Sequence, residues 1–568
     1  MISLQVYLVI ANMREDILKK IKAELFLDSK GGNVARLLEM CKRALSSLTQ
    51  NQGGGALFPS TSRRTVDEVI AASSIPEKFN PDFLKVLDNL HKEIQAGVNA
   101  NSQYTVRNIM PQANFLHMAT YMATSLYMLN AVSGENSSEG LNTEIACASA
   151  MAKLAGYDGR TSAGVFTFSG VGTNLYGVKM GLSKISNGIS AKGLDSGDVV
   201  VVAPRSAHYS FRNVVNWLGI GTENCISVET DPDQTVKIDF LEKTLRDLLK
   251  RKKKIACILL SGGTTSNMAI DDIEAVFNIR NFLAEEFKLD YVPHIHVDSV
   301  IGWVYLNFKS YDFEKNVLGL SKECLKITKG NYEKISKLQF ADSFGIDFHK
   351  TGYIAYTSSI VIVKDKQDFD RLGIDFHSDS PLFHNEEVYN PGKFTLETSR
   401  SCANIIATWN ALQAMGQEGY QVLIASSVEL AIYFRQELAK RNSSGFYLVN
   451  RDFYGSDIYI RCYSANSDGH STFEKEQNDM ELLRGGNDYT SKFYKWFNDD
   501  YVPKKGKISI GKTNSAMYTK KGEPVVAIRI YLLNLNLSRD SLDTILDELV
   551  EAKSQFDVLD AMKDRRRV

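Results

Sequence analysis

The sequence predicts an α/β fold with a mostly parallel sheet, preceded by a helical segment and followed by a smaller α+β region. The chain has 568 residues, several times the ~150 residues of one typical domain, so more than one domain is expected. Its composition, with 44% hydrophobic and 23% charged residues, is that of a folded globular protein. In the middle of the chain, short β-rich runs alternate with stretches long enough for crossover helices, which is typical of parallel sheets. These runs are 164–168, 198–203, 255–260, 295–298, 344–347 and 359–363.

The N-terminal segment, residues 1–112, has a helical pattern. Apolar residues recur at three- and four-residue steps from Arg14 to Leu48, and the glycine-rich stretch 51–56 then predicts a loop. A second helical stretch is expected over 82–94. The apolar run 4–11 is about half the length that spans a bilayer and lacks the flanks of a signal peptide. It is expected to be a core strand or the end of a helix.

Two further domains are predicted, a large one over 113–405 and a small one over 406–568. The large domain adds helices to the β-rich runs, with a polar loop at 133–140. The small domain begins with a long helical pattern and ends with two strands and a closing helix. The expected helices are 115–157 apart from that loop, 241–249, 272–287, 402–438 and 541–556, and the late strands are 457–461 and 525–531.

The charge and the cysteine content disfavour several function classes. Lys and Arg number 66 and Asp and Glu number 67, which gives a net charge of −1, so no overall field favours nucleic acid or an anionic membrane. The seven cysteines form no CxxC pair, which disfavours a zinc or iron–sulfur site and indicates a reducing compartment. We therefore expect a cytoplasmic protein without nucleic-acid or membrane partners.

Polar residues follow several of the predicted strands, where ligands bind in α/β sheets. The turn Ser169-Gly-Val-Gly-Thr before an apolar helix could hold a phosphate, or it is simply a tight turn. Lys350 lies in a glycine-containing turn, where a desolvated lysine could attack a carbonyl group, or it is a solvated charge. Asp298 ends an apolar strand and should face a positive group. His294 and His296 are better interpreted as core residues than as metal ligands, so no metal site is predicted.

The order of these groups along the chain resembles the group II pyridoxal-phosphate-dependent amino-acid decarboxylases. The phosphate turn is followed by His208-Tyr-Ser, then by Gly263-Thr-Thr, then by His296-Val-Asp, and finally by Asp347-Phe-His-Lys. The likeness runs from about residue 110 to 420 and is strongest to bacterial tyrosine decarboxylases. It implies the fold-type I architecture of aspartate aminotransferase, pyridoxal 5'-phosphate as cofactor and a homodimer.

The same resemblance implies roles for individual residues. Lys350 is the lysine that binds the cofactor covalently, and Asp298 pairs with the pyridinium nitrogen. His208 stacks on the cofactor ring, while Val300 packs on its other face. The remaining roles belong to Ser169, Gly170 and Val171 in the phosphate turn, Thr265 and His349 near the cofactor, Arg400 at the substrate carboxylate and His117 near the substrate.

The sequence departs from the family pattern close to the expected cofactor. The residues after Asp298 include bulky Val300 and Trp303 where relatives have small side chains. Phe348 replaces a common proline, and Ser169 stands where glycine is usual. No group with a catalytic role is lost, but these changes make it unsafe to transfer the substrate from tyrosine decarboxylase.

The resemblance implies decarboxylation of an L-amino acid, either aromatic or acidic, to an amine and carbon dioxide. A substrate carboxylate held out of the cofactor plane selects this bond for cleavage. The alternatives are a carbon–carbon lyase, an aldehyde-forming or condensing relative, and a cofactor-binding scaffold without activity. The complete set of Lys350, Asp298 and His208 speaks against the scaffold.

The resemblance also implies a mobile loop that brings a proton donor over the site. The interval 373–394 has no regular periodicity and is expected to be that loop. Tyr389 is the predicted donor because a phenol stays protonated at neutral pH and the following Asn390-Pro-Gly suggests a hinge. His377 and His384 are the alternative donors.

Overall fold

The chain forms two compact units, residues 1–105 with 500–509, and residues 106–499 with 510–568. The boundaries expected at 112/113 and 405/406 stay predictions, and the second of them falls inside a helix that begins at Cys402. The structure is a computed structural model. It describes residues 4–49, 55–56, 65–88, 90, 93, 97–185, 189–194, 197–373, 383, 389–441, 445–451, 455–464 and 467–565.

The first unit contains four of the described helices, α1 (Leu4–Leu25), α2 (Val34–Thr49), α3 (Val66–Ala72) and α4 (Phe83–Leu87). The continuous pattern predicted from Arg14 to Leu48 is wrong, because a loop separates α1 from α2. In that loop the Asp28 carboxylate accepts the backbone N–H groups of Lys30, Gly32 and Asn33, which favours a turn over a helix. The apolar run 4–11 belongs to α1, as the helical alternative predicted.

A seven-stranded sheet is the centre of the second unit, in the order β1-β7-β6-β5-β4-β2-β3. The pairs β6–β5, β5–β4, β4–β2 and β2–β3 are parallel, whereas β7 is antiparallel to both of its neighbours. The prediction of a mostly parallel sheet is therefore confirmed, and only β3 was missed. The strands are β1 (Ala163–Thr167), β2 (Val199–Pro204), β3 (Cys225–Val228), β4 (Lys254–Ser261), β5 (His294–Asp298), β6 (Ser343–Asp347) and β7 (Ser359–Val363).

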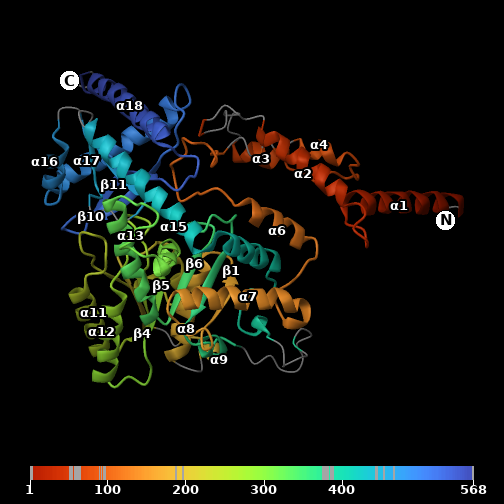
Figure 1. The fold of residues 1–568 in the computed structure, drawn as a ribbon, viewed down its shortest axis with the longest axis horizontal. Helices are drawn as coiled ribbons and strands as arrows, with labels where there is room; N and C mark the ends of the chain where they lie inside the picture. The colour runs from red at the N-terminus through yellow and green to blue at the C-terminus, as the bar shows by residue number, and fades with distance from the viewer. Residues whose placement is uncertain are drawn as a thin grey trace. The chain divides into compact units, whose positions relative to one another are not determined.

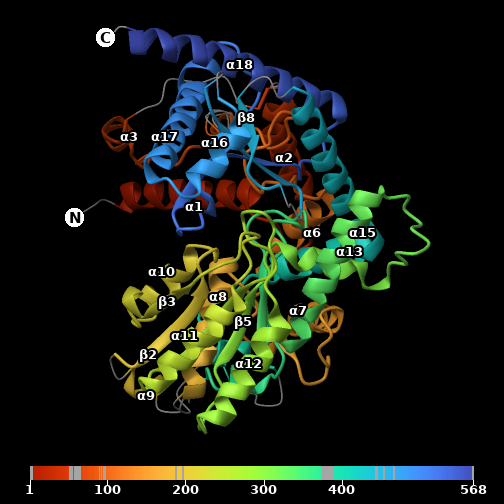
Figure 2. The ribbon, with the colours of Figure 1, turned by 90° about the vertical axis from the view of Figure 1, so that its left-hand side faces the viewer.

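Helices cover both faces of this sheet, so the strands are buried on both sides and are almost wholly apolar. Val201 of β2 packs with Leu182 of α8, whereas the next residue, Val202, belongs to the cluster that contains Leu241 of α11. Figure 2 shows α11 and α12 running alongside the strands. The helices of this region are α6 (Phe115–Ser125), α7 (Gly134–Leu154), α8 (Gly170–Ile185), α9 (Ile189–Lys192), α10 (Ser210–Trp217), η1 (Thr222–Asn224), α11 (Ile238–Lys250), α12 (Ile273–Glu286), η2 (Gly302–Ser310), α13 (Lys322–Ile335), η3 (Ser336–Phe340), α14 (Gln367–Asp370) and η4 (Pro391–Lys393).

The polar loop expected at 133–140 is wrong in most of its length, because α7 already begins at Gly134. Within that stretch the backbone leaves helical geometry at Ser137, with φ −161° and ψ 63°. The long helix α15 (Cys402–Lys440) is interrupted in the same way at Gly416, where φ is 57°, a value that glycine adopts without steric cost.

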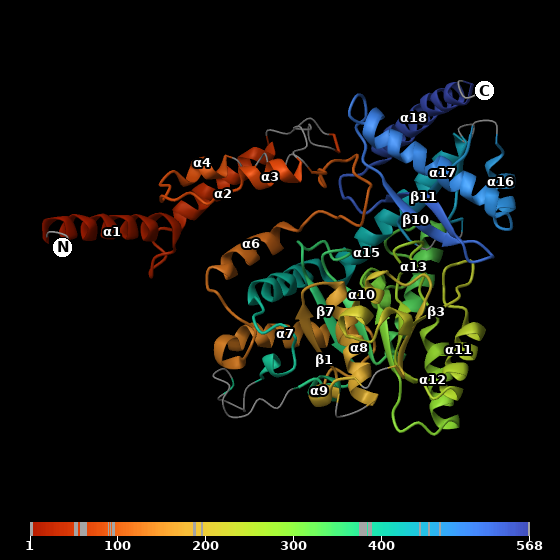
Figure 3. The same ribbon diagram turned by 180° about the vertical axis from the view of Figure 1, so that it is seen from behind.

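A four-stranded antiparallel sheet in the order β10-β11-β9-β8 forms the C-terminal region. Helix α17 packs along β11 and β9, and Figures 1 and 3 show α17 beside β11. The predicted strands 457–461 and 525–531 correspond to β9 and β11. The elements are β8 (Phe446–Leu448), β9 (Asp457–Cys462), α16 (Gly469–Glu476), α17 (Met480–Trp496), η6 (Phe497–Tyr501), β10 (Gly511–Tyr518), β11 (Pro524–Tyr531) and α18 (Arg539–Arg565).

Candidate active site

One cavity of about 240 Å³ lies at the carboxyl ends of the central strands, where α/β sheets bind ligands. Its walls come from the ends of β4, β5 and β6 and from the start of α8. All nine residues predicted to contact the cofactor line it, namely Ser169, Gly170, Val171, His208, Thr265, Asp298, Val300, His349 and Lys350. The strand-end pattern in the sequence therefore identified one continuous site.

Lys350 lies in the turn after β6 and faces two carboxylates. Its Nζ lies 2.8 Å from Oδ2 of Asp347. Burial lowers the pKa of Lys350, but Asp347 and Asp298 outweigh burial, so that this pKa is raised. Asp347 also accepts a hydrogen bond of 2.6 Å from Ser359 Oγ. Asp347 was not among the predicted site residues, although it stands three positions before Lys350 and ends a buried strand.

Asp298 ends β5 and is oriented by α8. Its Oδ2 accepts a hydrogen bond of 2.9 Å from Asn174 Nδ2, and both side chains are buried. Lys350 is the positive group that the sequence analysis required near Asp298. Asn174 was not predicted, but its position one helical turn after Gly170 could have indicated that it faces the same strand end.

The predicted phosphate turn opens helix α8 onto the cavity. A Cβ atom at Gly170 would lie 2.8 Å from Asp347 Oδ2 and 3.1 Å from Val300 Cγ1, so a larger residue would fill the space between the turn and the strand ends. Because α8 has 16 residues, the first N–H groups of a full-length helix point toward this space. The turn, a lysine and a strand-end carboxylate fit the phosphate, the aldehyde and the ring nitrogen of pyridoxal phosphate.

Both histidines of the cavity have a lowered pKa. Burial lowers the pKa of His208. The negative charges of Asp298 and Asp347 oppose this shift, whereas the positive charges of Lys350 and Arg529 add to it. Nδ1 of His208 lies 2.7 Å from Ser210 Oγ, which fixes the ring. Burial also lowers the pKa of His349, whose Nδ1 lies 2.9 Å from the Ser358 carbonyl oxygen.

The C-terminal sheet supplies one wall through the loop that carries Thr265. The hydroxyl of Tyr459 on β9 donates to the Thr265 carbonyl at 2.7 Å, and the hydroxyl of Tyr531 on β11 donates to the same oxygen. Asp457 accepts the backbone N–H of Asn267 at 2.6 Å. The position of Thr265 therefore depends on residues almost two hundred or more positions later in the chain.

The departures from the family pattern have a common structural explanation. Trp303 is fully buried and does not line the cavity. Its ring packs edge-on against Phe348, with ring centroids 5.3 Å apart, and against Tyr420 at 5.6 Å. Trp303 and Phe348 therefore pack together in the core, whereas Val300 lines the cavity.

A second cavity, of about 480 Å³, contains His117 and Arg400 and shares Tyr356 with the first. Arg400 is 7% exposed, and Glu144 binds it through both terminal nitrogens. Arg400 also donates to the carbonyl oxygen of Ala131 at 2.7 Å. A guanidinium held in this way is already neutralised, which argues against its predicted role at the substrate carboxylate.

His117 is buried in the wall of this cavity, and neither ring nitrogen has a hydrogen bond within the described residues. Burial lowers its pKa, while Asn404 opposes the shift. A buried imidazole can donate to or accept from a ligand. This geometry suits the predicted place of His117 near a substrate.

The contacts of Tyr389 argue against its predicted role as proton donor. Its side chain packs into the core, with its ring centroid 6.2 Å from that of Phe394, and it does not appear among the described residues of the Lys350 cavity. Burial raises its pKa, with Glu144 adding to the effect. The alternative donors His377 and His384 lie outside the described residues.

Tyr356 is the phenol that the cavity does contain. Its ring centroid lies 4.5 Å from that of His349, and Lys350 is close enough to oppose the rise that burial produces in the pKa of Tyr356. Tyr356 was not among the predicted site residues. Its position, between β6 and β7 rather than at a strand end, explains why the strand-end pattern missed it.

His294 and His296 lie at the opposite, amino end of the central strands. Both rings lie 2.7 Å from Ser343 Oγ and are fully buried, and burial lowers the pKa of His296 to about 3. This agrees with their interpretation as core residues. No group of metal-ligating side chains occurs in the described part of the chain, and no described helix is long and apolar enough to cross a membrane.

Solved structures share this architecture. The crystal structure of mouse CSAD in apo form matches with a TM-score of 0.72 and 16% identity, over 91% of this chain and 99% of that chain. The crystal structure of Oryza sativa TDC with PLP and tryptamine matches with a TM-score of 0.72 and 15% identity, over 93% and 99%. At such identities the likeness defines the fold class alone, and the predicted fold-type I α/β architecture is confirmed.

The family follows from the sequence match. Residues 65–312 and 324–457 match the pyridoxal-dependent decarboxylase conserved domain, and the chain belongs to this family, as predicted. An L-tyrosine decarboxylase of Enterococcus faecium is 29% identical over 255 residues, 42% of this chain and 40% of that protein. An aspartate 1-decarboxylase of Aliivibrio fischeri is 23% identical over 363 residues, 64% of this chain and 59% of that protein. These matches span about half the length of the two relatives.

Proposed function

We propose that this chain is a pyridoxal-phosphate-dependent decarboxylase that converts an L-amino acid into the corresponding amine and carbon dioxide. The observation that carries the proposal is the single cavity in which Lys350 lies between Asp347 and Asp298, opposite the start of α8. The family match and the names of the relatives support the same activity.

Each wall of the cavity has a part in holding the cofactor. Lys350 would bind it covalently, the turn Ser169-Gly-Val at the start of α8 would hold its phosphate, and Asp298 would pair with its ring nitrogen. His208, Val300, Thr265 and His349 line the same cavity and would contact the ring. When bound, the cofactor supplies an electron-accepting ring for the pair of electrons left by the departing carboxylate.

The chain's own residues control charge and protons around that ring. Asp298, fixed by Asn174, favours the protonated ring nitrogen because a nearby carboxylate stabilises a cation. Asp347 stabilises the positive charge of Lys350 whenever its amine is free. A phenol is protonated at neutral pH, and Tyr356 lines the cavity around Lys350 whereas Tyr389 does not, so we assign the proton donated to the product carbon to Tyr356 rather than to Tyr389.

The substrate carboxylate needs a cation that no other group neutralises. Arg529 on β11 forms no ion pair within the described residues, although it acts on the pKa of Asp457 as well as on that of His208. Its guanidinium contacts the Asn108 side chain and the ring of Tyr531, 5.7 Å from its guanidinium carbon. We therefore assign the carboxylate to Arg529 in place of Arg400. Arg529 would bind the carboxylate and orient the substrate for the bond to be broken.

We further propose that the protein is a cytoplasmic homodimer. Helices α1 and α2 leave Ile17, Leu18, Leu38 and Leu45 each more than 40% exposed, and apolar helix faces of this kind are usually covered by a partner. Six cysteines, Cys147, Cys225, Cys257, Cys324, Cys402 and Cys462, form no disulfide, as in a reducing compartment. Sedimentation of an active species near 63.4 kDa would show a monomer and contradict the dimer.

The function is tested by supplying a panel of the common amino acids to the protein with added cofactor. Release of carbon dioxide together with an amine is expected for at least one amino acid. An aldehyde in place of the amine would indicate the aldehyde-forming alternative. A visible absorbance band that borohydride removes, without any turnover before the treatment, would indicate a scaffold.

A further inference from the structure

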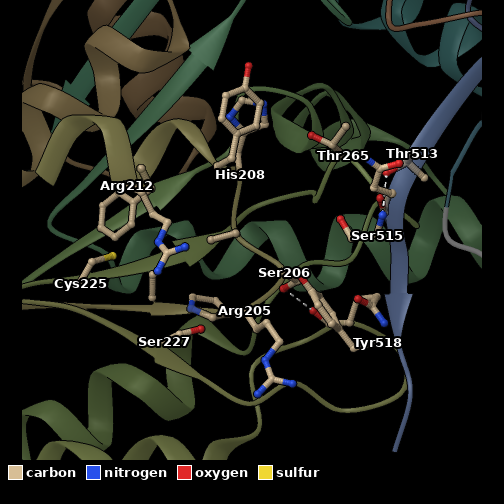
Figure 4. A pocket seen from close by; sticks show the side chains of 18 of the residues that line it. Arg205, Ser206, His208, Arg212, Cys225, Ser227, Thr265, Thr513, Ser515 and Tyr518 are labelled. Carbon is tan, nitrogen blue, oxygen red and sulfur yellow. Dashed lines mark hydrogen bonds between the residues drawn. The ribbon is translucent and has the colours of Figure 1, made fainter. Parts of the chain in front are cut away.

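A third cavity adjoins the cofactor site on the side of His208. It has about 520 Å³ and shares His208 and Thr265 with the cavity around Lys350. Its walls come from the segment after β2, from α10 and from the strands β10 and β11. Figure 4 shows Arg205 and Arg212 on one side of this basic cavity and Thr513, Ser515 and Tyr518 of β10 on the other.

The basic cavity is lined by four cations, Arg205, Arg212, Lys512 and Arg529, and by no carboxylate among the described residues. None of the four forms an ion pair in the described part of the chain, in contrast to Arg246, which binds Glu286, and Arg400, which binds Glu144. The whole chain has a net charge of −1. Four cations without an ion-paired anion therefore make this cavity a locally positive region.

Neutral groups hold these cations in place without cancelling their charge. Arg205 donates to the Gly522 carbonyl oxygen at 3.1 Å and stacks on the Tyr518 ring at 5.3 Å. Lys512 donates to Asn514 Oδ1 at 2.9 Å. The Nε of Arg529 is buried and makes no hydrogen bond within the described residues. Cations held by carbonyls, amides and aromatic faces keep their charge for a ligand.

The cavity also offers neutral donors that suit oxygen atoms of a ligand. The hydroxyls of Ser227, Thr513 and Ser515 line it between the cations. Guanidinium, ammonium and hydroxyl groups together bind carboxylate, sulfinate and phosphate oxygens. The basic cavity shares His208 and Thr265 with the cofactor site, so it lies next to the space that a ligand anchored at the cofactor would occupy.

We propose that the basic cavity binds an anionic group on the side chain of the substrate, so that the preferred substrate is an acidic amino acid. This inference rests on the proposed decarboxylase function. Arg529 takes the carboxylate that is lost, while Arg205, Arg212 and Lys512 take the side-chain oxyanion. The shared chemistry is an oxyanion, and carboxylate, sulfinate and phosphate side chains are distinguished by experiment.

The first test compares acidic and neutral substrates for the holoenzyme. L-aspartate, L-glutamate, L-cysteine sulfinate and O-phospho-L-serine are assayed beside L-tyrosine and L-tryptophan. At least one acidic substrate is expected to have a kcat/KM about 100-fold above every neutral one, with a preference that falls as salt is added. A preference for a neutral amino acid would overturn this inference and leave the proposed decarboxylation standing.

The second test uses Arg212→Gln combined with Lys512→Gln, because both side chains lie away from Lys350. The ratio of kcat/KM between the best acidic and the best neutral substrate should fall at least tenfold. The matched control, Lys250→Gln with Lys520→Gln, removes two exposed positive charges outside the cavity and should preserve the ratio. An equal fall in both variants would mean that overall charge, and not the cavity, sets the preference.

A binding measurement keeps the inference testable without turnover. Calorimetry should detect succinate binding to the wild-type holoenzyme at low salt and at least tenfold weaker binding to the double variant. If succinate does not bind the wild type, the basic cavity is not an anion site. The same conclusion would follow if an acidic segment of a partner subunit already fills the cavity. Succinate binding without any decarboxylation would contradict the proposed function and not the anion site.

Discussion

The two cavities beside the cofactor site differ in how their arginines are held. In the cavity of His117, Arg400 is buried and bound by Glu144 through both terminal nitrogens. In the basic cavity, Arg205, Lys512 and Arg529 have neutral partners. An arginine near an active site therefore does not by itself indicate anion binding. The charge that a substrate meets depends on the pairing of each arginine, and pairing is decided by tertiary contacts.

The largest expected effect comes from Lys350, the lysine that lines the cofactor cavity. Lys350→Ala should lower turnover by about 10⁴-fold or more, because the cofactor loses its covalent anchor and the side-chain amine of Lys350 is no longer available to the reaction. The measurement is carbon dioxide release, with the melting temperature as a control for folding. Full activity in this variant would refute pyridoxal chemistry at this cavity.

The paired arginine should matter for stability. Arg400→Gln leaves the Glu144 carboxylate buried without its partner, which is expected to lower the free energy of unfolding by about 3–5 kcal/mol. Denaturant unfolding monitored by circular dichroism provides the measurement. The double variant Arg400→Met with Glu144→Leu should recover most of this loss, since neither charge then remains buried. A wild-type unfolding curve for Arg400→Gln would contradict the pairing described above.

The unpaired arginine should matter for catalysis. Arg529→Gln is expected to lower kcat/KM by about 100-fold, the loss of a charge-assisted hydrogen bond to the substrate, with little change in the unfolding curve. The two arginine variants together sharpen the comparison, because each should affect one property and spare the other. If Arg400→Gln reduced kcat/KM more than Arg529→Gln without loss of stability, the assignment of the carboxylate would return to Arg400.

Tyr356 and Tyr389 allow a similar comparison, in which the expected change in rate is smaller. Tyr356→Phe should slow product formation by about 10- to 100-fold because the proton donor is removed, whereas Tyr389→Phe should leave the rate within a factor of three. Amine and aldehyde are both quantified, since a missing proton donor diverts the product. A slow Tyr389→Phe beside a normal Tyr356→Phe would restore the original prediction for Tyr389.

The smallest effect concerns the pH at which the cofactor-free protein takes up its cofactor. Asp347 and Asp298 raise the pKa of Lys350 above its ordinary value, so the reactive free amine becomes more abundant as pH rises. Asp347→Asn should lower this pKa and make uptake several-fold faster at neutral pH, with the profile displaced to lower pH. Absorbance of the bound cofactor follows the rate. An unchanged profile would show that Asp298 alone sets the pKa.

The sequence allowed the large sheet and the cofactor cavity to be predicted because both depend on local patterns. Apolar strands followed by polar residues place Asp298 and Lys350 at one edge of the sheet whatever the rest of the chain does. Arg529 lies on the C-terminal sheet, and nothing in its local sequence connects it to His208. Glu144 likewise looks like any helix residue until packing brings it to Arg400. The surroundings of Arg529 and the pairing of Arg400 with Glu144 decide which arginine is available to a substrate. Both depend on residues that are far apart in the sequence.

The double hydrogen bond to the Thr265 carbonyl has a consequence for how the protein is made. Its donors, Tyr459 and Tyr531, are synthesised 194 and 266 residues after the loop that they hold. A nascent chain that has exposed only the large sheet therefore lacks one wall of its cavity. The cofactor should be captured only after the ribosome has released nearly the whole chain, so truncated products should not carry it.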